Sequence, residues 1–338
     1  MSTHLSSLMP NPTRGRRHRL PSGSLWTFAL QRAMQSLVTV FIVLTVVFLL
    51  MRLLPIEGYF GDEYDRLTPE QREARLEAMG LMDPIHIQLK NFYLALSRGD
   101  LGTSIIYRPH VPIAEIIEPK VPYSLKFGLA SLVLSLTIGL LLGIFQAREK
   151  DKWLDRLGTA YVVFINAVPA AVYFLFVQLY VTQLAGLPML YDSTRPISWI
   201  LPAVSMSLGG IAGYAMWMRR FMVDELNKDY IKLARAKGLS NTAVMFKHVL
   251  RNAFVPMAQH LPTTILMTIA GSIFIESLYS IPGMGGLLIE AITRQDNPLV
   301  QTLVLIYSTI GIFGLFLGDL LMAIIDPRIK LEKKGGAR

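Results

Sequence analysis

Residues 219–256 read RRFMVDELNKDYIKLARAKG and then LSNTAVMFKHVLRNAFVP, a charged stretch between two long apolar runs. Its first half predicts a helix that carries Asp224 and Lys228 four residues apart. This helix is expected to end at Gly238, because glycine readily takes the left-handed conformation that closes a helix. The stretch therefore predicts a helix, a glycine turn and a second helix.

The second helix of this stretch is predicted to be amphipathic, with Ser240 or Asn241 as its N-cap. Its apolar face is formed by Ala243, Phe246, Leu250 and Ala253, and a basic face by Lys247 and Arg251. Two interpretations fit this pattern. The hairpin is either a rigid knob that enters a groove of another protein or an interfacial element lying on lipid headgroups.

Six runs without Asp, Glu, Lys or Arg surround this stretch, at residues 33–51, 127–147, 157–191, 196–218, 252–275 and 297–318. A helix needs roughly 20 apolar residues to cross a bilayer, and each run is about that long or longer. The composition agrees, because 52% of the 338 residues are hydrophobic and only 17% are charged. The chain is therefore predicted to be an all-α integral membrane protein.

The transmembrane helices are predicted at about 33–54, 123–147, 158–184, 197–219, 254–277 and 299–325. The third contains Pro169, where a kink is expected. The first run is too long for the apolar core of a signal peptide and no small-residue cleavage site follows it, so it is interpreted as a retained helix. Residues 1–27 are a basic extension that is expected to be disordered, and residues 332–338 form a tail.

Lysine and arginine are unevenly distributed between the two sides of these six spans. Of the 33 Lys and Arg residues, 22 lie in the two terminal segments and in loops 148–156 and 219–251. Positive residues in short loops favour the cytoplasm, so both termini and the loop 220–252 are predicted to be cytoplasmic. The same distribution accounts for the basic net charge without a nucleic-acid partner.

The segment 55–121 between the first two spans is predicted to be external and to hold two short helices. Thr68-Pro-Glu-Gln71 is a capping box that starts the first, and Gly80 ends it. The second follows Asp83-Pro84 and continues at helical spacing to Gly99. This segment serves either as a structural cap or as a docking surface for an external partner.

Several short motifs lie in the loop and along the rest of the chain. The loop contains ARAKGLS at 234–240 and RNAFVP at 251–256. The other motifs are GDLGTS at 99–104, ESLYSIPGMG at 276–285, DNPLVQ at 296–301, and Asp319 with DPR at 326–328. Together they resemble motifs of the membrane permease subunits of ATP-binding-cassette importers, in the oligopeptide and dipeptide branch. The resemblance covers about residues 28–331, which makes it more specific than one short motif.

The resemblance implies the type I importer permease fold, in which the loop 220–252 is the EAA coupling loop that sits in a cleft of a cytoplasmic ATPase. The implied coupling residues are Tyr230, Ala234, Ala236, Gly238 and Leu239, with Arg251 and Pro256 bounding the second helix. The implied partners are a second permease subunit, ABC ATPase subunits, an extracytoplasmic substrate-binding protein and membrane lipid. The implied location is the cytoplasmic (inner) membrane of a bacterium or archaeon.

The implied function is to form half of a translocation pathway that works by alternating access. Short peptides are the expected substrate, with nickel chelates, opines and oligosaccharides as alternatives. The chain has no Gly-x-x-x-x-Gly-Lys-Ser/Thr loop, so ATP is expected to be used by the partner and no cofactor to be bound directly. No catalytic or metal-ligand spacing is visible, and the absence of cysteine excludes thiolate chemistry.

Ionisable residues at membrane depth mark a transport pathway by default, and here they are Glu276, Asp319 and His260. Asp319 is expected to pair with a basic residue or a helix terminus rather than to carry protons, and His260 to be hydrogen-bonded between helices or to line a gate. A self-contained secondary transporter or channel is the main alternative function. A membrane-anchored scaffold is a third.

Overall fold

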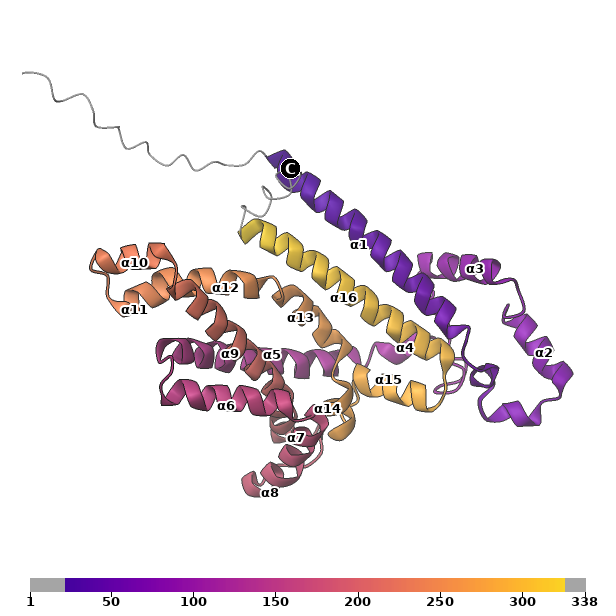
Figure 1. Ribbon diagram of the computed structural model, residues 1–338. Coiled ribbons are helices and arrows are strands. Elements are labelled where there is room, and N and C mark those ends of the chain that lie inside the picture. Colours follow the sequence, from indigo (N-terminus) through magenta and orange to yellow (C-terminus); the bar gives the residue numbers. More distant parts are fainter. Residues whose placement is uncertain (1–21, 326–338) are drawn as a thin grey trace, which may run out of the picture.

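The computed structural model describes residues 22–325, and all regular structure within that range is helical (Figure 1). The predicted extension 1–27 falls largely, and the tail 332–338 entirely, outside the described residues. Five helical segments are long and apolar enough to cross a membrane, and a bent helix pair supplies a sixth. The unbent segments are α1 (Ser22–Met51), α5 (Val121–Arg148), η4 with α9 (Pro196–Trp199 and Ile200–Leu226), α13 to α14 (Leu261–Leu278) and α16 (Asn297–Ile325).

The third span is broken rather than kinked. It consists of α6 (Trp153–Ala167), α7 (Ala170–Phe176), the π-helical turn η3 (Val177–Val181) and α8 (Thr182–Ala185). The direction changes by 110° between α6 and α7. Pro169 disfavours helical backbone at the residue before it, and Val168 is accordingly extended, which ends α6 and turns the chain.

The fifth span is also discontinuous, where the sequence predicts one helix over 254–277. Its pieces are α12 (Leu250–Ala258), α13 (Leu261–Met267), η6 (Thr268–Ala270) and α14 (Ile273–Leu278). Pro262 in the first turn of α13 lacks the N–H that would continue α12. Gly271 has a φ of +73°, which interrupts the helix before α14.

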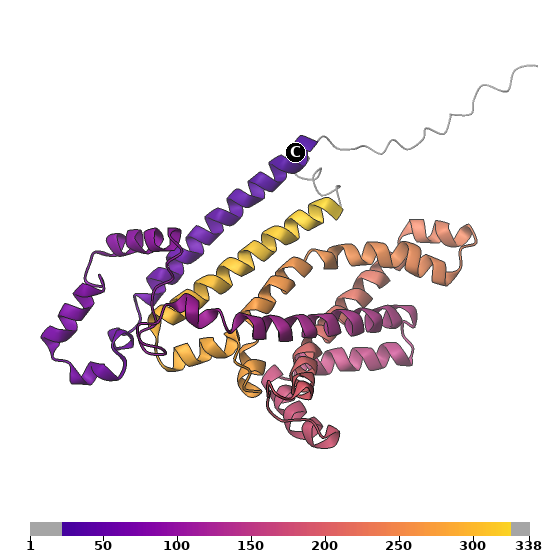
Figure 2. The same ribbon diagram turned by 180° about the vertical axis from the view of Figure 1, so that it is seen from behind.

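The spans pack through glycines at two interfaces. A Cβ atom on Gly143 of α5 would lie 2.6 Å from the Ala215 carbonyl of α9, and one on Gly314 of α16 would lie 2.7 Å from Cα of Thr263 in α13. Glycine therefore permits close backbone approach at both places. Helices α1 and α16 lie side by side in both views (Figures 1 and 2).

An ion pair between a half-buried arginine and a buried aspartate joins the third and fourth spans. The Arg219 guanidinium of α9 donates to both carboxylate oxygens of Asp155 in α6, from Nε at 2.5 Å and from Nη2 at 2.7 Å. The Asp155 side chain is buried, and the backbone N–H of Asp151 also donates to it. This bidentate geometry fixes the two helices relative to each other.

The segment 55–121 contains both helices that the sequence predicts. Thr68 makes the expected capping box at the start of α2 (Pro69–Ala78), and α3 (Ile85–Ser97) follows. The short elements η1 (Ile56–Tyr59), η2 (Gly61–Arg66) and α4 (Ile113–Ile117) complete the segment. Helix α3 packs against α1, because the Tyr93 hydroxyl donates to the Phe41 carbonyl and the two rings stack at 5.1 Å.

Candidate functional site

The hairpin that follows the fourth span is the candidate site. It is made of α10 (Asp229–Ala236), α11 (Asn241–Val244) and the π-helical turn η5 (Met245–Val249), which leads into α12. The prediction of one helix over 219–238 is wrong. Helix α9 ends at Leu226 and α10 begins at Asp229, so Asp224 and Lys228 do not share a helix.

The turn of the hairpin has the predicted geometry. Gly238 has a φ of +78°, and a Cβ atom placed there would meet nothing within 4 Å. Ser240 Oγ accepts a hydrogen bond from the Ala243 N–H, which confirms Ser240 as the cap of the second helix. The turn is therefore fixed by its own backbone and is open to its surroundings.

The predicted coupling residues do not all lie on the exposed side of the hairpin. Tyr230, Ala236, Gly238, Leu239 and Arg251 are exposed, whereas Ala234 is buried in the hairpin core. Pro256 lies inside α12 and is half-buried.

The apolar face of the second helix is shifted from its predicted position. Phe246 is 55% exposed, Ala243 and Leu250 are half-buried, and Ala253 is the one buried residue of the predicted face. The other buried residues are Val244, Met245 and Val249. The π-turn η5 adds a residue to the helical repeat, which rotates the face. Phe246 and Leu233, which is 56% exposed, are consequently large apolar side chains that the hairpin does not bury.

A polar cluster ties the hairpin to the helices on either side of it. The Tyr230 hydroxyl of α10 donates to the carboxylate of Glu225 in α9. Asn252 Nδ2 of α12 donates to Glu225 Oε1 at 3.0 Å and to the Tyr230 hydroxyl at 2.8 Å. Burial and the bond to Glu225 raise the pKa of the Tyr230 hydroxyl, so it remains a donor at neutral pH.

The Glu276 carboxylate is a buried acceptor of several hydrogen bonds at the end of the molecule opposite the hairpin. Its side chain is 1% exposed, and it accepts hydrogen bonds from the Ser124 hydroxyl at 2.7 Å and from the N–H groups of Ser272, Gly285 and Gly286. The glycine-rich stretch 283–286 begins α15 (Met284–Thr293). The Glu276 carboxylate stabilises that start because it accepts N–H groups left free in the first turn.

Asp319 forms the ion pair that the sequence predicts. Its Oδ2 lies 3.2 Å from Nη1 of Arg32 in α1, and Gln259 Nε2 donates to its Oδ1 at 3.3 Å. His260 precedes α13 and is exposed. Within residues 22–325 its ring makes no hydrogen bond, so the expected interhelical bond of His260 is not found.

Asp296, the first residue of the DNPLVQ motif, is another buried carboxylate, and the sequence assigned it no role. It is 0% exposed, and its Oδ2 accepts from the Ser104 hydroxyl at 2.5 Å and from the N–H groups of residues 105–107. Its Oδ1 accepts from the N–H of Leu299 and so caps α16. An acidic residue directly before a helix was the available signal, but the contact with Ser104 crosses 192 residues.

Comparisons with known proteins agree with this arrangement. Residues 139–331 match the family described as binding-protein-dependent transport system inner membrane component. The chain is 33% identical over 312 residues to a dipeptide transport system permease protein of Bacillus subtilis, covering 91% of this chain and 99% of that protein. A glutathione transport system permease protein of Salmonella typhimurium is 32% identical over 312 residues, covering 90% and 99%.

An oligopeptide transport system permease protein of Streptococcus pneumoniae is 39% identical over 216 residues, covering 62% of this chain and 42% of that protein. The chain belongs to the family of binding-protein-dependent transport system inner membrane components.

This transport-system component is a permease subunit of an ATP-binding-cassette importer and a multi-pass membrane protein, as the sequence predicts. The family match runs from Gly139 in α5 beyond the end of α16 and so includes the whole hairpin. The relatives that align over 312 residues cover about nine-tenths of the chain, well beyond the family match. A permease subunit conducts a solute rather than catalysing a reaction.

Proposed function

We propose that this permease carries short peptides and that its hairpin couples transport to a separate ATPase. The relatives named above are permeases for a dipeptide, an oligopeptide and glutathione, all of which are short peptides. The observation that carries the coupling proposal is the hairpin, whose turn is open at Gly238 and whose large apolar side chains Leu233 and Phe246 are unburied. Such side chains suit a groove of a partner protein.

The proposed complex contains a second, homologous permease subunit, cytoplasmic ABC ATPase subunits and an extracytoplasmic substrate-binding protein. ATP is used by the ATPase subunits, and this chain binds no cofactor. We place both termini and the hairpin in the cytoplasm of a bacterial or archaeal cell and the spans in its inner membrane. The Lys and Arg distribution supports that orientation.

The hairpin is packed against the spans, so a movement of the hairpin would displace them. Its buried side chains form one cluster with residues of α5, α9 and α12, among them Met218, Met222, Ile231 and Val249. The bonds among Tyr230, Glu225 and Asn252 add a polar connection to the same helices. When ATP binding closes the ATPase pair, a hairpin held in its cleft moves with it and biases the spans between inward-facing and outward-facing states.

The ionisable residues do not favour the secondary-transporter alternative. The Glu276 and Asp319 carboxylates each accept hydrogen bonds or ion pairs from more than one protein group. A proton relay would instead need a series of carboxylates without such partners. A gating role for Glu276, Asp319 or His260 stays a prediction.

One experiment tests coupling and substrate together. Phe246→Asp should abolish recovery of the ATPase subunits with the tagged permease and reduce dipeptide uptake at least tenfold, because it places a charge where an apolar contact is proposed. Leu53→Asp is the control, since Leu53 is 81% exposed and follows α1 at the opposite end. Normal ATPase recovery and uptake in Phe246→Asp would show that the hairpin faces lipid or solvent instead.

A second experiment tests the orientation. The chain contains no cysteine, so a single introduced cysteine reports its own side of the membrane. In intact cells a membrane-impermeant maleimide should label Glu77→Cys in α2 and leave Lys237→Cys in the hairpin unlabelled. The opposite pattern would invert the proposed topology.

A further inference from the structure

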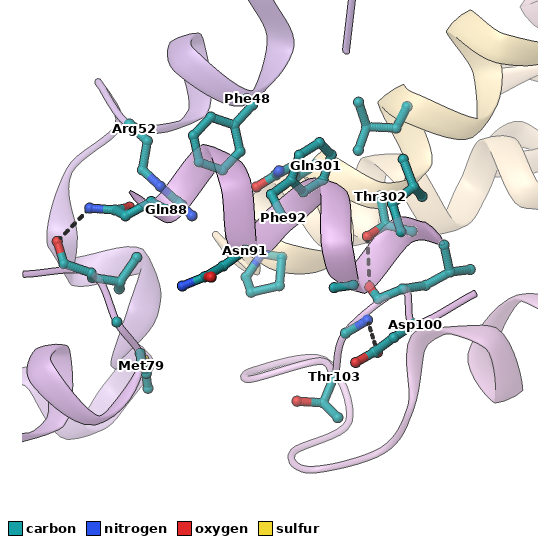
Figure 3. Close-up of a pocket in the computed structure, with 18 of the residues that line it drawn as sticks. Phe48, Arg52, Met79, Gln88, Asn91, Phe92, Asp100, Thr103, Gln301 and Thr302 are labelled. Carbon is teal, nitrogen blue, oxygen red and sulfur yellow. Dashed lines mark hydrogen bonds between the residues drawn. The ribbon is translucent and has the colours of Figure 1, made fainter. Parts of the chain in front are cut away.

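A cavity of about 410 Å³ lies where the segment 55–121 meets the ends of two spans (Figure 3). Its walls come from the last turn of α1, from α3, from the loop 99–105 and from the first turns of α16. Its volume falls within the range of small-molecule sites. No part of the proposed coupling mechanism uses it.

The walls of the cavity are held in place by contacts of their own. The rings of Phe48 in α1 and Phe92 in α3 lie 5.1 Å apart and form its apolar side. Thr302 of α16 donates to the Leu101 carbonyl at 3.1 Å, and Asp296 fixes the loop just beyond. The cavity is therefore a consequence of how the segment is attached to α1 and α16.

Three polar groups in the cavity wall lack hydrogen-bond partners within residues 22–325. Arg52 Nε and Gln88 Oε1 are buried atoms with no partner. Gln301 is only 8% exposed, and its amide makes no hydrogen bond in the described part of the chain. Arg52 Nε and Gln88 Oε1 have almost no accessible surface, so an occupant of the cavity does not reach these two atoms. The Gln301 amide is not fully buried, lines the cavity and is open to an occupant.

Two opposite charges face the cavity without pairing to each other. Arg52 stacks on the Phe48 ring at 4.6 Å and donates from Nη1 to the Tyr59 hydroxyl, and no carboxylate among the described residues forms an ion pair with it. Asp100 accepts from the Gly102 N–H with Oδ1, which leaves Oδ2 without a protein donor in the described part. Figure 3 shows Arg52 and Asp100 on opposite sides of the cavity, with Phe92 drawn between them.

We propose that this cavity is a binding site for a short peptide with free termini. The peptide carboxylate pairs with Arg52 and its ammonium group with Asp100. The Gln301 amide pairs with peptide backbone groups, while side chains contact Phe48 and Phe92. This inference rests on the proposed peptide function and adds a site at the end of the molecule opposite the hairpin.

A phospholipid headgroup is the competing occupant, because the cavity lies at the ends of two spans. A phosphodiester also offers an anion to Arg52. A phosphatidylethanolamine headgroup also offers an ammonium group to Asp100. The Gln301 amide is both donor and acceptor, which matches the N–H and C=O of a peptide group, and the relatives of this chain are permeases for short peptides; both favour a peptide over a lipid.

Calorimetric titration of trialanine into the purified permease–ATPase complex, reconstituted without the binding protein, tests the site. Arg52→Gln and Asp100→Asn should each weaken trialanine binding at least tenfold, because each removes one ion pair. N-acetyl-trialanine amide, which lacks both charged termini, should bind at least tenfold more weakly than trialanine. Arg98→Gln is the matched control, because Arg98 follows α3 and does not line the cavity.

The outcomes separate this site from the proposed function. Equal binding of the free and blocked peptides, or unchanged binding in both variants, overturns the site. Uptake of trialanine by cells together with no titratable binding overturns the site alone, whereas binding without uptake overturns the peptide transport proposal and leaves the site standing. A phospholipid that mass spectrometry finds on the wild-type complex but not on Asp100→Asn or Arg52→Gln, with no trialanine binding, assigns the cavity to lipid. If the Arg52→Gln variant fails to fold, trialanine binding is measured in Asp100→Asn and Gln301→Leu instead. Weaker binding supports the site, and unchanged binding in both variants overturns it.

Discussion

Replacing Asp296 by alanine should release the loop 104–107 from the start of α16. Four donors converge on Asp296 Oδ2, the Ser104 hydroxyl at 2.5 Å and the N–H groups of residues 105, 106 and 107 at 3.2, 2.9 and 2.9 Å. At about 1 kcal/mol net for each bond, the local opening free energy should fall by about 4 kcal/mol. That change corresponds to roughly a thousandfold increase in the open population of the loop.

Amide hydrogen exchange measures this opening directly. The peptide that contains Ile105, Ile106 and Tyr107 should exchange about a thousand times faster in Asp296→Ala, whereas peptides from α5 and α9 should change little. Glu115→Gln is the control, because Glu115 is an exposed carboxylate on the same segment. Unchanged exchange in Asp296→Ala would refute the conclusion that this carboxylate holds the loop.

Three further predictions concern packing, charge and pH. Gly314→Ala should destabilise the protein by about 2 kcal/mol, measured by thermal unfolding in detergent, because its Cβ would lie 2.7 Å from the backbone of α13, whereas Gly311→Ala, whose nearest neighbour would be 3.8 Å away, should not. Arg219→Leu should cost about 3 kcal/mol by leaving Asp155 buried and unpaired, and adding Asp155→Leu should recover part of the loss. The Arg75 guanidinium of α2 pairs with the Glu63 carboxylate and lowers the pKa of Glu63 from its ordinary value of 4.5. The stability that this ion pair gives to the segment 55–121 is therefore present above pH 4.5 and is lost as the pH falls below it. The protection factors of the α2 amides, which are corrected for the intrinsic pH dependence of exchange, should accordingly fall below pH 4.5 in the wild type and depend less on pH in Glu63→Gln.

Features set by short-range physics could be read from the sequence. The cap at Thr68 and the turn at Gly238 depend on a few neighbouring residues, and both are found where the pattern places them. Ser240, which caps α11, also depends only on neighbouring residues. The carried-over coupling residues, in contrast, are only partly gathered on one surface, because Ala234 belongs to the core of the hairpin.

Features set by long-range contacts could not be read in this way. The helical repeat assumed for residues 241–253 placed Phe246 on the apolar face, where it is in fact exposed, because one π-turn depends on packing against α9 rather than on local propensity. The glycine-rich stretch 283–286 becomes a helix start only because the Glu276 carboxylate lies beside it. Pro169 identified where the third span bends, but the 110° angle is decided by what the two pieces pack against.

The sequence by itself determined that this chain is a multi-pass membrane protein, because a bilayer requires about 20 apolar residues for each helix whatever their neighbours are. It also indicated the family, because its motifs between residues 99 and 328 resemble those of importer permeases. Only the tertiary structure decided how distant motifs meet, with Ser104 on Asp296 and Ser124 on Glu276. It alone formed the cavity between Arg52 and Asp100, because the position of one helix on another depends on the summed contacts of side chains far apart in the sequence.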